Sequence, residues 1–243
     1  MVEGLPLPRD TVGLLEGITT TRAIRQFAPE AVPEDALATM LFCAARAPSG
    51  SNRQPFRFVV LRDGTRARRA KELLAANARG GWLGKRAIDG YDRGSGGAGD
   101  SPKARVVRVI TEFVERFAEV PVVVLVCLAR YRAATPYEGA SVYPACQNLL
   151  LAARGLGYGG VLTMWQTGVE TELAEVLGIP DGVAISATVA LGRPVGGHGP
   201  VRRRPLGELV YEDGWGEAAP WALDPPGTRH TAAGPPVIRM DKE

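Results

Sequence analysis

The segment that most constrains the fold is the apolar run from Pro121 to Leu128, which reads Pro-Val-Val-Val-Leu-Val-Cys-Leu. Short runs rich in β-branched residues are typical of strands. Because neither face of this strand carries a polar side chain, both faces must be covered. The sequence therefore predicts a central, fully buried strand.

Other segments predict the elements around that strand. A proline followed by acidic residues begins an amphipathic helix at Val32–Asp35, and Ser141–Arg154 is a long apolar helix that ends at Gly155. Further helices are expected over Arg66–Asn77, Val106–Phe117 and Glu170–Leu177, and further strands over Phe56–Leu61 and Val183–Gly192. The chain therefore contains both helices and strands.

Length and composition indicate the domain organisation. A chain of 243 residues, 45% of them hydrophobic, can bury a full core, and we expect one domain over residues 1–211. Residues 80–102 are rich in glycine, with Gly94–Gly99 at their centre, and predict a flexible insertion. Residues 212–243 form a C-terminal extension, in which Trp215 and Trp221 favour an arm packed on the partner subunit over a partly disordered tail.

Charge and composition argue against several classes of function. The net charge is only +3, from 29 basic and 26 acidic residues, so no overall field favours nucleic acid as a partner. The three cysteines are widely spaced and the two histidines lie in Gly/Pro-rich segments, so neither a metal site nor a histidine-based triad is expected. With no secretory signal and no run long enough to span a membrane, we expect a soluble, cytoplasmic protein.

A polar loop lies between Pro48 and Pro55, where a predicted helix gives way to a strand. Its neutral hydroxyls and carboxamides offer both donors and acceptors, which suits the edge of a flat heterocycle better than a metal. A structural turn, with Ser and Asn side chains bonded to nearby backbone, fits the residues equally well. Two interpretations also apply to Gly157–Trp165, whose glycines allow either the close approach of a ligand or a simple turn into a strand.

These stretches occur in an order that resembles the nitroreductase superfamily of FMN-dependent oxidoreductases. The polar loop resembles the family's flavin-facing loop, and Thr21-Arg22-Ala23-Ile24-Arg25-Gln26-Phe27 resembles its Arg-Arg-Ser-x-Arg-x-Phe phosphate segment. Leu191–Pro194 and Arg202–Leu206 follow in order, so the resemblance covers roughly Thr11 to Tyr211. It implies an α+β fold with a central, mixed but mainly antiparallel β-sheet flanked by helices, in a domain-interlocked homodimer.

The resemblance also implies a set of FMN-binding residues. Guanidinium groups bind phosphate bidentately, so Arg203 is expected on the phosphate, with Arg22 and Arg25 near the phosphate or the ring. The polar loop would face the ring, typically from the other protomer, and the strand after Gly160 would pass its redox edge. The full set is Thr21, Arg22, Ala23, Arg25, Pro48, Ser49, Gly50, Ser51, Asn52, Gln54, Gly160, Leu162, Thr163, Met164 and Arg203.

Two residues of this set depart from the family pattern. Thr21 and Ala23 stand where the family has arginine and serine, which removes one cation and one hydroxyl. Thr21 can still form a hydrogen bond, and Arg202 or Arg204 can supply the missing charge. A solvated loop is the alternative interpretation of the arginine triplet.

The implied activity is ping-pong hydride transfer from NADH or NADPH through FMN to a small acceptor such as a nitroaromatic or a quinone. It needs neither a catalytic side chain nor a metal. Two alternatives stay open: specialised flavin chemistry on the same fold, such as flavin fragmentation, dehalogenation or desaturation, and a non-catalytic flavin-binding protein. Nucleic-acid binding is the weakest alternative, because the basic cluster around Arg68 has no aromatic interleaving.

Overall fold

The computed structural model describes residues 7–91, 93–94 and 99–231. The chain divides into two compact units, one ending at His198 and the other beginning at Gly199. The second unit therefore begins ahead of the boundary near Tyr211 that the sequence suggests. No helix within the described ranges is both long enough and apolar enough to cross a lipid bilayer.

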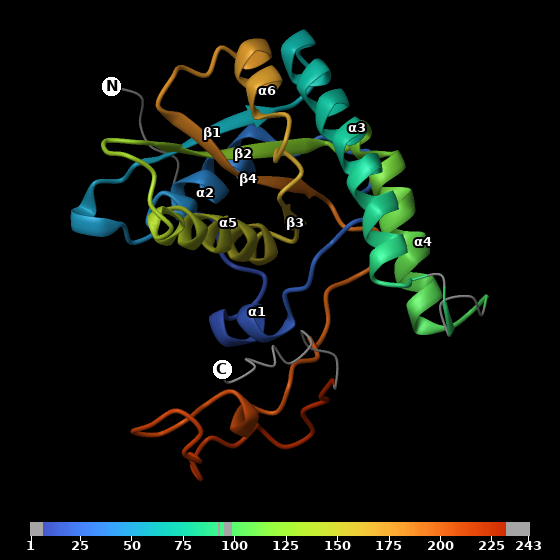
Figure 1. Ribbon diagram of the computed structural model, residues 1–243, viewed down its shortest axis with the longest axis vertical. Coiled ribbons are helices and arrows are strands. Elements are labelled where there is room, and N and C mark those ends of the chain that lie inside the picture. The colour runs from blue at the N-terminus through green and yellow to red at the C-terminus, as the bar shows by residue number, and fades with distance from the viewer. Residues whose placement is uncertain (1–6, 92, 95–98, 232–243) are drawn as a thin grey trace, which may run out of the picture. The chain divides into compact units, whose positions relative to one another are not determined.

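The first unit is an α+β fold built on a four-stranded sheet (Figure 1). The strands are β1 (Phe56–Leu61), β2 (Val122–Ala129), β3 (Gly159–Thr163) and β4 (Val183–Gly192), in the spatial order β1-β2-β4-β3. β2 is central and buried along almost its whole length, which confirms the prediction from its apolar sequence. All pairings between the described strands are antiparallel, so the described sheet is antiparallel rather than mixed.

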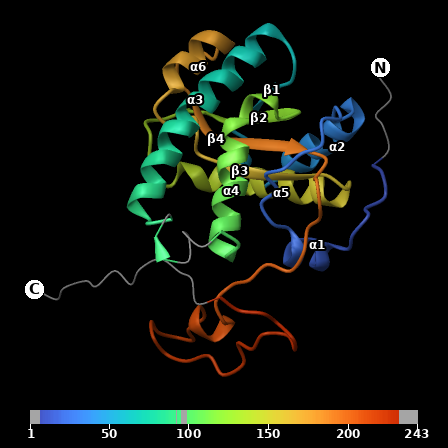
Figure 2. The ribbon, with the colours of Figure 1, turned by 90° about the vertical axis from the view of Figure 1, so that its right-hand side faces the viewer.

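Helices cover both faces of the sheet (Figure 2). The helices of this unit are α1 (Leu14–Thr20), α2 (Glu34–Ala44), α3 (Thr65–Ile88), α4 (Pro102–Glu115), α5 (Tyr143–Gly155) and α6 (Glu170–Leu177), of which α2 to α6 pack on the sheet. One core packs α2 and α5 against one face, and a second packs α3, α4 and α6 against the other. Successive β2 side chains alternate between them, with Val124 and Val126 in the first core and Val123 and Leu125 in the second.

Helix α3 is longer than the sequence suggests. We expected a helix over Arg66–Asn77 and a flexible insertion from residue 80, and the insertion is wrong for residues 80–88, which continue the helix. Trp82 is buried beside Val114, and its indole N–H donates to Thr111 Oγ1 at 2.9 Å. These contacts outweigh the cost of about 1 kcal/mol for each helical glycine relative to alanine. Residues 92 and 95–98 of the expected insertion lie outside the described residues.

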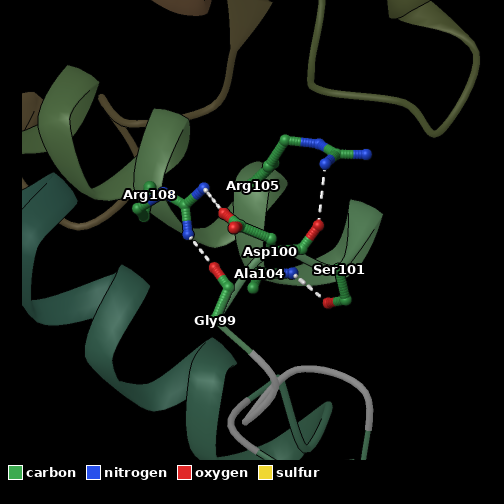
Figure 3. A network of polar contacts seen from close by, with 6 residues as sticks. All are labelled: Gly99, Asp100, Ser101, Ala104, Arg105 and Arg108. Atoms are coloured by element: carbon green, nitrogen blue, oxygen red, sulfur yellow. Dashed lines mark hydrogen bonds and ion pairs between the residues drawn. The ribbon is translucent and has the colours of Figure 1, made fainter.

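The start of α4 is closed by its own polar contacts (Figure 3). Ser101 Oγ accepts the N–H of Ala104 at 3.0 Å and caps the helix. Arg105 donates to the backbone carbonyl of Asp100, and Arg108 pairs with the Asp100 carboxylate at 3.5 Å. Both arginines are therefore engaged locally at the start of their own helix.

Candidate functional site

The arginine segment Thr21–Phe27 lies against the start of β3. The N–H of Ile24 donates to the carbonyl oxygen of Gly160 at 3.0 Å. Phe27 forms an isolated antiparallel bridge with Pro194, which follows the end of β4. The segment is therefore attached to the sheet at its middle and at its C-terminal end, and Arg22 and Arg25 lie on either side of the Ile24 contact.

This packing accounts for the glycines of β3. A Cβ atom on Gly159 would lie 2.5 Å from Ile24 Cγ1, and one on Gly160 would lie 2.5 Å from the carbonyl oxygen of Ala190. At such distances a neighbour must shift: the Ile24 side chain at Gly159, and the backbone of Ala190 at Gly160, where glycine is therefore required more strictly. The close approach that the sequence suggested for a ligand is made at these two residues by the chain itself.

A histidine outside every motif in the sequence holds this segment in place. His198 is half-buried; its Nδ1 accepts the backbone N–H of Arg22 at 3.4 Å, and its Nε2 lies 3.1 Å from the carbonyl oxygen of Tyr158. Burial lowers the pKa of His198 below its ordinary value; the Tyr158 contact opposes this, and the cations Arg154 and Arg22 lower the pKa further. The neutral ring is therefore favoured.

Two guanidinium groups near His198 lack an acidic partner. Arg154, at the end of α5, is half-buried; its Nη2 lies 3.5 Å from Thr20 Oγ1, and its buried Nε has no hydrogen-bond partner. Within the described ranges neither Arg154 nor Arg22 forms an ion pair. An unpaired buried donor costs roughly 1–3 kcal/mol, and more on a charged group. The corner formed by Arg22, Arg154 and His198, called the cationic corner below, therefore favours an anionic ligand.

The two departures from the family pattern lie beside this corner. The Thr21 hydroxyl donates to the carbonyl oxygen of Gly17 at 2.6 Å and closes the end of α1, and Ala23 is exposed. Arg154 comes from another element but reaches Thr20, the neighbour of Thr21. The Arg154 guanidinium therefore lies beside Thr21, where the family has an arginine. No sequence motif identified Arg154 as a site residue.

Arg25 lines a cavity of about 460 Å³ together with Glu112 and Glu119. Burial lowers the pKa of Arg25, against the opposing effect of the Tyr91 phenol. Arg116 lines the same cavity and is ion-paired with both carboxylates, so the charges there offset one another. The cationic corner, whose two guanidinium groups form no ion pair within the described ranges, is therefore the better anion site. A larger, apolar hollow of about 750 Å³ lies beside β1 and contains none of the predicted site residues, so cavity size does not locate the site.

The β3 residues continue from the arginine segment along the edge of the sheet. Thr163 Oγ1 donates to the carbonyl oxygen of Thr188 at 3.3 Å, Leu162 is half-buried and Met164 is 46% exposed. Asn77 of α3 donates to the carbonyl oxygen of Trp165 at 2.7 Å and fixes the chain just beyond. The structure therefore brings the arginine segment and Gly160–Met164 to one edge of the sheet.

The polar loop Pro48–Gln54 lies at the opposite edge, before β1 (Figure 1). The N–H of Gly50 donates to Ser141 Oγ at 3.2 Å, next to the start of α5, whereas Arg154 is at its end. β1 and β3 are three strand spacings apart, about 14 Å. A single chain therefore does not bring the polar loop to the cationic corner.

The backbone of this loop is strained. Ser51, Asn52 and Gln54 have positive φ angles of 51°, 52° and 48°. Each non-glycine residue in this conformation costs roughly 1–3 kcal/mol. The loop is held from within, because the Gln54 N–H donates to Ser49 Oγ at 2.9 Å and the Gln54 side chain donates to Asn52 Oδ1 at 3.2 Å. The side chains of residues 51–54 stay exposed.

Arg203 belongs to the second unit, where its side chain is exposed. Its backbone forms a parallel bridge with His230, and its guanidinium donates to the carbonyl oxygen of Arg202 at 3.0 Å. Arg204 is ion-paired with Glu208 at 2.7 Å. Of the two arginines considered as replacements for the missing charge, Arg204 is thus already paired.

Comparison with known proteins relates this arrangement to one family. The sequence pattern of the nitroreductase family matches residues 18–193. A protein from Archaeoglobus fulgidus, assigned as an NADH dehydrogenase/NAD(P)H nitroreductase, is 26% identical over 187 residues, which cover 74% of this chain and 84% of the relative.

Two solved structures are similar in fold. A protein from Desulfovibrio desulfuricans, assigned as a nitroreductase and crystallised in complex with FMN, has a TM-score of 0.60 and 28% identity, covering 84% of this chain and 99% of its own. A variant of the FMN and NADPH-dependent nitroreductase NfnB from Sphigopyxis sp. strain HMH has a TM-score of 0.64 and 22% identity, covering 84% and 100%.

Proposed function

The chain belongs to the nitroreductase family, and we propose that it is an FMN-dependent oxidoreductase that passes hydride from NADH or NADPH to a small acceptor, such as a nitroaromatic or a quinone. The observation that carries the proposal is the cationic corner beside β3. There Arg22 and the buried, unpaired Nε of Arg154 face no acidic partner among the described residues.

The phosphate of FMN fits this corner. It carries close to two negative charges at neutral pH and offers oxygens that guanidinium groups bind bidentately. A phosphate there would give Arg154 Nε the acceptor that the chain does not provide. Arg203 stays a proposed phosphate ligand, as the resemblance to the family implies.

The isoalloxazine ring would extend from this corner along β3. Its redox edge would be lined by Leu162, Thr163 and Met164. The hydrogen bond from the Thr163 hydroxyl to the carbonyl oxygen of Thr188 would fix the rotamer of Thr163. The polar loop of the same chain lies at the other edge of the sheet. We therefore propose a homodimer, in which the polar loop of a second copy supplies donors and acceptors to the pyrimidine edge.

The division of labour follows from these positions. The bound flavin supplies the hydride-accepting and hydride-donating chemistry. The chain would bind the phosphate, orient the ring and place positive charge near it, which would favour acceptance of hydride by the flavin. Exchange of the nicotinamide for the acceptor over the same face makes the scheme ping-pong.

The first test is the visible spectrum of the purified protein, with FMN titrated into the flavin-free form. We expect about one FMN per chain and 10- to 100-fold weaker binding for Arg22→Met and Arg154→Met, because a hydrogen bond to a charged group contributes about 1.5–3 kcal/mol. Arg79→Met, on the exposed surface of α3, is the matched control and should bind FMN normally. Riboflavin lacks the phosphate, so all these variants should bind it alike.

A colourless protein that takes up no added FMN would remove the proposal. If FMN binds, oxidation of NADH or NADPH coupled to loss of a nitroaromatic or quinone tests the reaction. Fragmentation of the flavin instead of reduction of the acceptor would favour the specialised chemistry. Bound FMN without any turnover would favour a binding protein.

A further inference from the structure

We propose that His198 is a positioning residue for the cofactor phosphate: its neutral ring ties the backbone of Arg22 to the carbonyl of Tyr158 and thereby sets where the Arg22 guanidinium lies. The inference rests on the function proposed above. It assigns a role to a residue that belongs to none of the family's motifs in this sequence.

The hydrogen bonds fix one state of the ring. A backbone N–H can only donate, so Nδ1 must accept from Arg22, and a carbonyl can only accept, so Nε2 must carry the proton toward Tyr158. Only the neutral Nε2–H tautomer meets both conditions. A doubly protonated ring would present a proton on Nδ1 to the N–H of Arg22 and break that contact.

Arg22 has little else to hold its backbone. Helix α1 ends at Thr20, and the N–H of Thr21 makes the last bond back to it, to Gly17. The next tie to the sheet is the N–H of Ile24 on Gly160. Between these two points, the Arg22 N–H donates to His198 Nδ1, and the described residues provide it with no other acceptor.

His198 is not itself placed to bind the phosphate. Both of its ring nitrogens are engaged with backbone groups, and the ring packs so closely on Gly159 that a Cβ there would lie 3.1 Å from Nε2. Its effect on an anion must therefore pass through Arg22. This makes it a positioning residue and not a ligand.

Two variants separate the two ends of the ring. In His198→Asn the amide oxygen can stand in for Nδ1 and keep the contact with Arg22, whereas His198→Gln places its amide near Nε2, toward Tyr158. In the FMN-free protein we expect the Arg22 amide proton to exchange about tenfold faster in His198→Gln than in the wild type or His198→Asn, because one such hydrogen bond contributes roughly 0.5–1.5 kcal/mol.

The functional measurement is the affinity for FMN and for riboflavin by quenching of flavin fluorescence. His198→Gln should bind FMN about tenfold more weakly and riboflavin unchanged, and His198→Asn should match the wild type for both. Equal exchange of the Arg22 amide in all three proteins would overturn the inference. So would faster exchange with an unchanged FMN affinity, or an equal loss for FMN and riboflavin, which would indicate general loosening.

The proposed function and the role of His198 are tested in different proteins, the wild type and the His198→Gln variant. A wild-type chain that takes up no FMN removes the proposed function and this inference with it. A wild-type chain that binds FMN while His198→Gln binds it equally well removes the inference alone. If His198→Gln does not fold, weaker FMN binding by the folded His198→Asn would contradict the assigned role of Nδ1.

Discussion

The two halves of the candidate site are built in different ways. The arginine segment is fixed by tertiary contacts, with Ile24 bonded to Gly160, Phe27 bridged to Pro194, and His198 bonded to Arg22. The polar loop is fixed mainly by bonds among its own residues, with outside contacts to Ser141 and to Arg57, whose guanidinium donates to the carbonyl oxygen of Gln54 at 3.0 Å. It keeps three non-glycine residues at positive φ.

The fold itself stabilises the conformation of the arginine segment, whereas ligand binding must stabilise that of the polar loop. Substitutions beneath the arginine segment should damage the whole sheet, because that segment is part of its edge. Changes in the polar loop should leave the fold intact, alter stability only slightly and act mainly on ligand binding. Variants of the two halves can therefore break or sharpen the contrast.

The largest effect is expected at Gly160. In Gly160→Ala the new Cβ would meet the backbone oxygen of Ala190 at 2.5 Å, and backbone cannot move aside as a side chain can. We expect a loss of about 3 kcal/mol in the free energy of unfolding, at the upper end for overpacking. Urea unfolding measures it.

Alanine substitutions at two other glycines provide a comparison for the stability change of Gly160→Ala. Gly159→Ala should cost less, because its new Cβ would meet Cγ1 of Ile24, a side chain that can shift. Gly84→Ala, with nothing within 4 Å of its Cβ in α3, should stabilise by up to about 1 kcal/mol. Equal stability of Gly160→Ala and Gly159→Ala would contradict the expected difference between a backbone neighbour at Gly160 and a side-chain neighbour at Gly159.

A smaller and opposite effect is expected in the polar loop. Gln54→Gly relieves a positive φ of 48°, so we expect the flavin-free chain to gain up to about 1 kcal/mol in stability. It should nevertheless bind FMN several-fold more weakly, because the side chain and the fixed loop geometry are lost. Urea unfolding and FMN titration measure the two changes.

Gln54→Ala is the matched control for this change, since it removes the side chain but keeps the strained backbone. It should lose FMN affinity without gaining stability. A Gln54→Gly chain that binds FMN as tightly as the wild type would mean that the strained conformation has no role in binding.

The sequence predicts those parts of the molecule that are determined by residues close together in the chain. The continuous apolar run of β2 requires burial on both faces, and the structure buries it so. The arginine segment and the polar loop are each recognisable because their residues are contiguous. The family resemblance then supplies their roles.

The remaining features depend on residues that are distant in the chain. Arg154 reaches Thr20 across 134 residues, and His198 reaches Arg22 across 176, so no spacing rule connects them. The continuation of α3 past Gly80 depends on Trp82 finding Thr111 on another helix. Such pairings follow from packing and cannot be inferred from periodicity.

The smallest effect expected is the pH dependence contributed by His198. Its pKa is lower in the folded chain than the ordinary value of about 6.5, chiefly through burial, with the cations Arg154 and Arg22 beside it and Arg193 above the Tyr158 ring. The unfolded chain then binds more protons than the folded chain in the window below that value. The contribution of His198 to stability is therefore complete above about pH 6.5 and is lost as the pH falls through the folded pKa.

Urea unfolding between about pH 7.5 and pH 5 should show this as a fall in wild-type stability that His198→Asn lacks, with a slope below the limit of about 1.4 kcal/mol per pH unit for one proton. The difference between the two proteins removes the contributions that they share. Parallel curves for the two proteins would mean that His198 titrates alike in both states. The arginine half of the site would then be held without regard to the charge on its histidine, and the contrast with the polar loop would rest on the sheet-edge contacts alone.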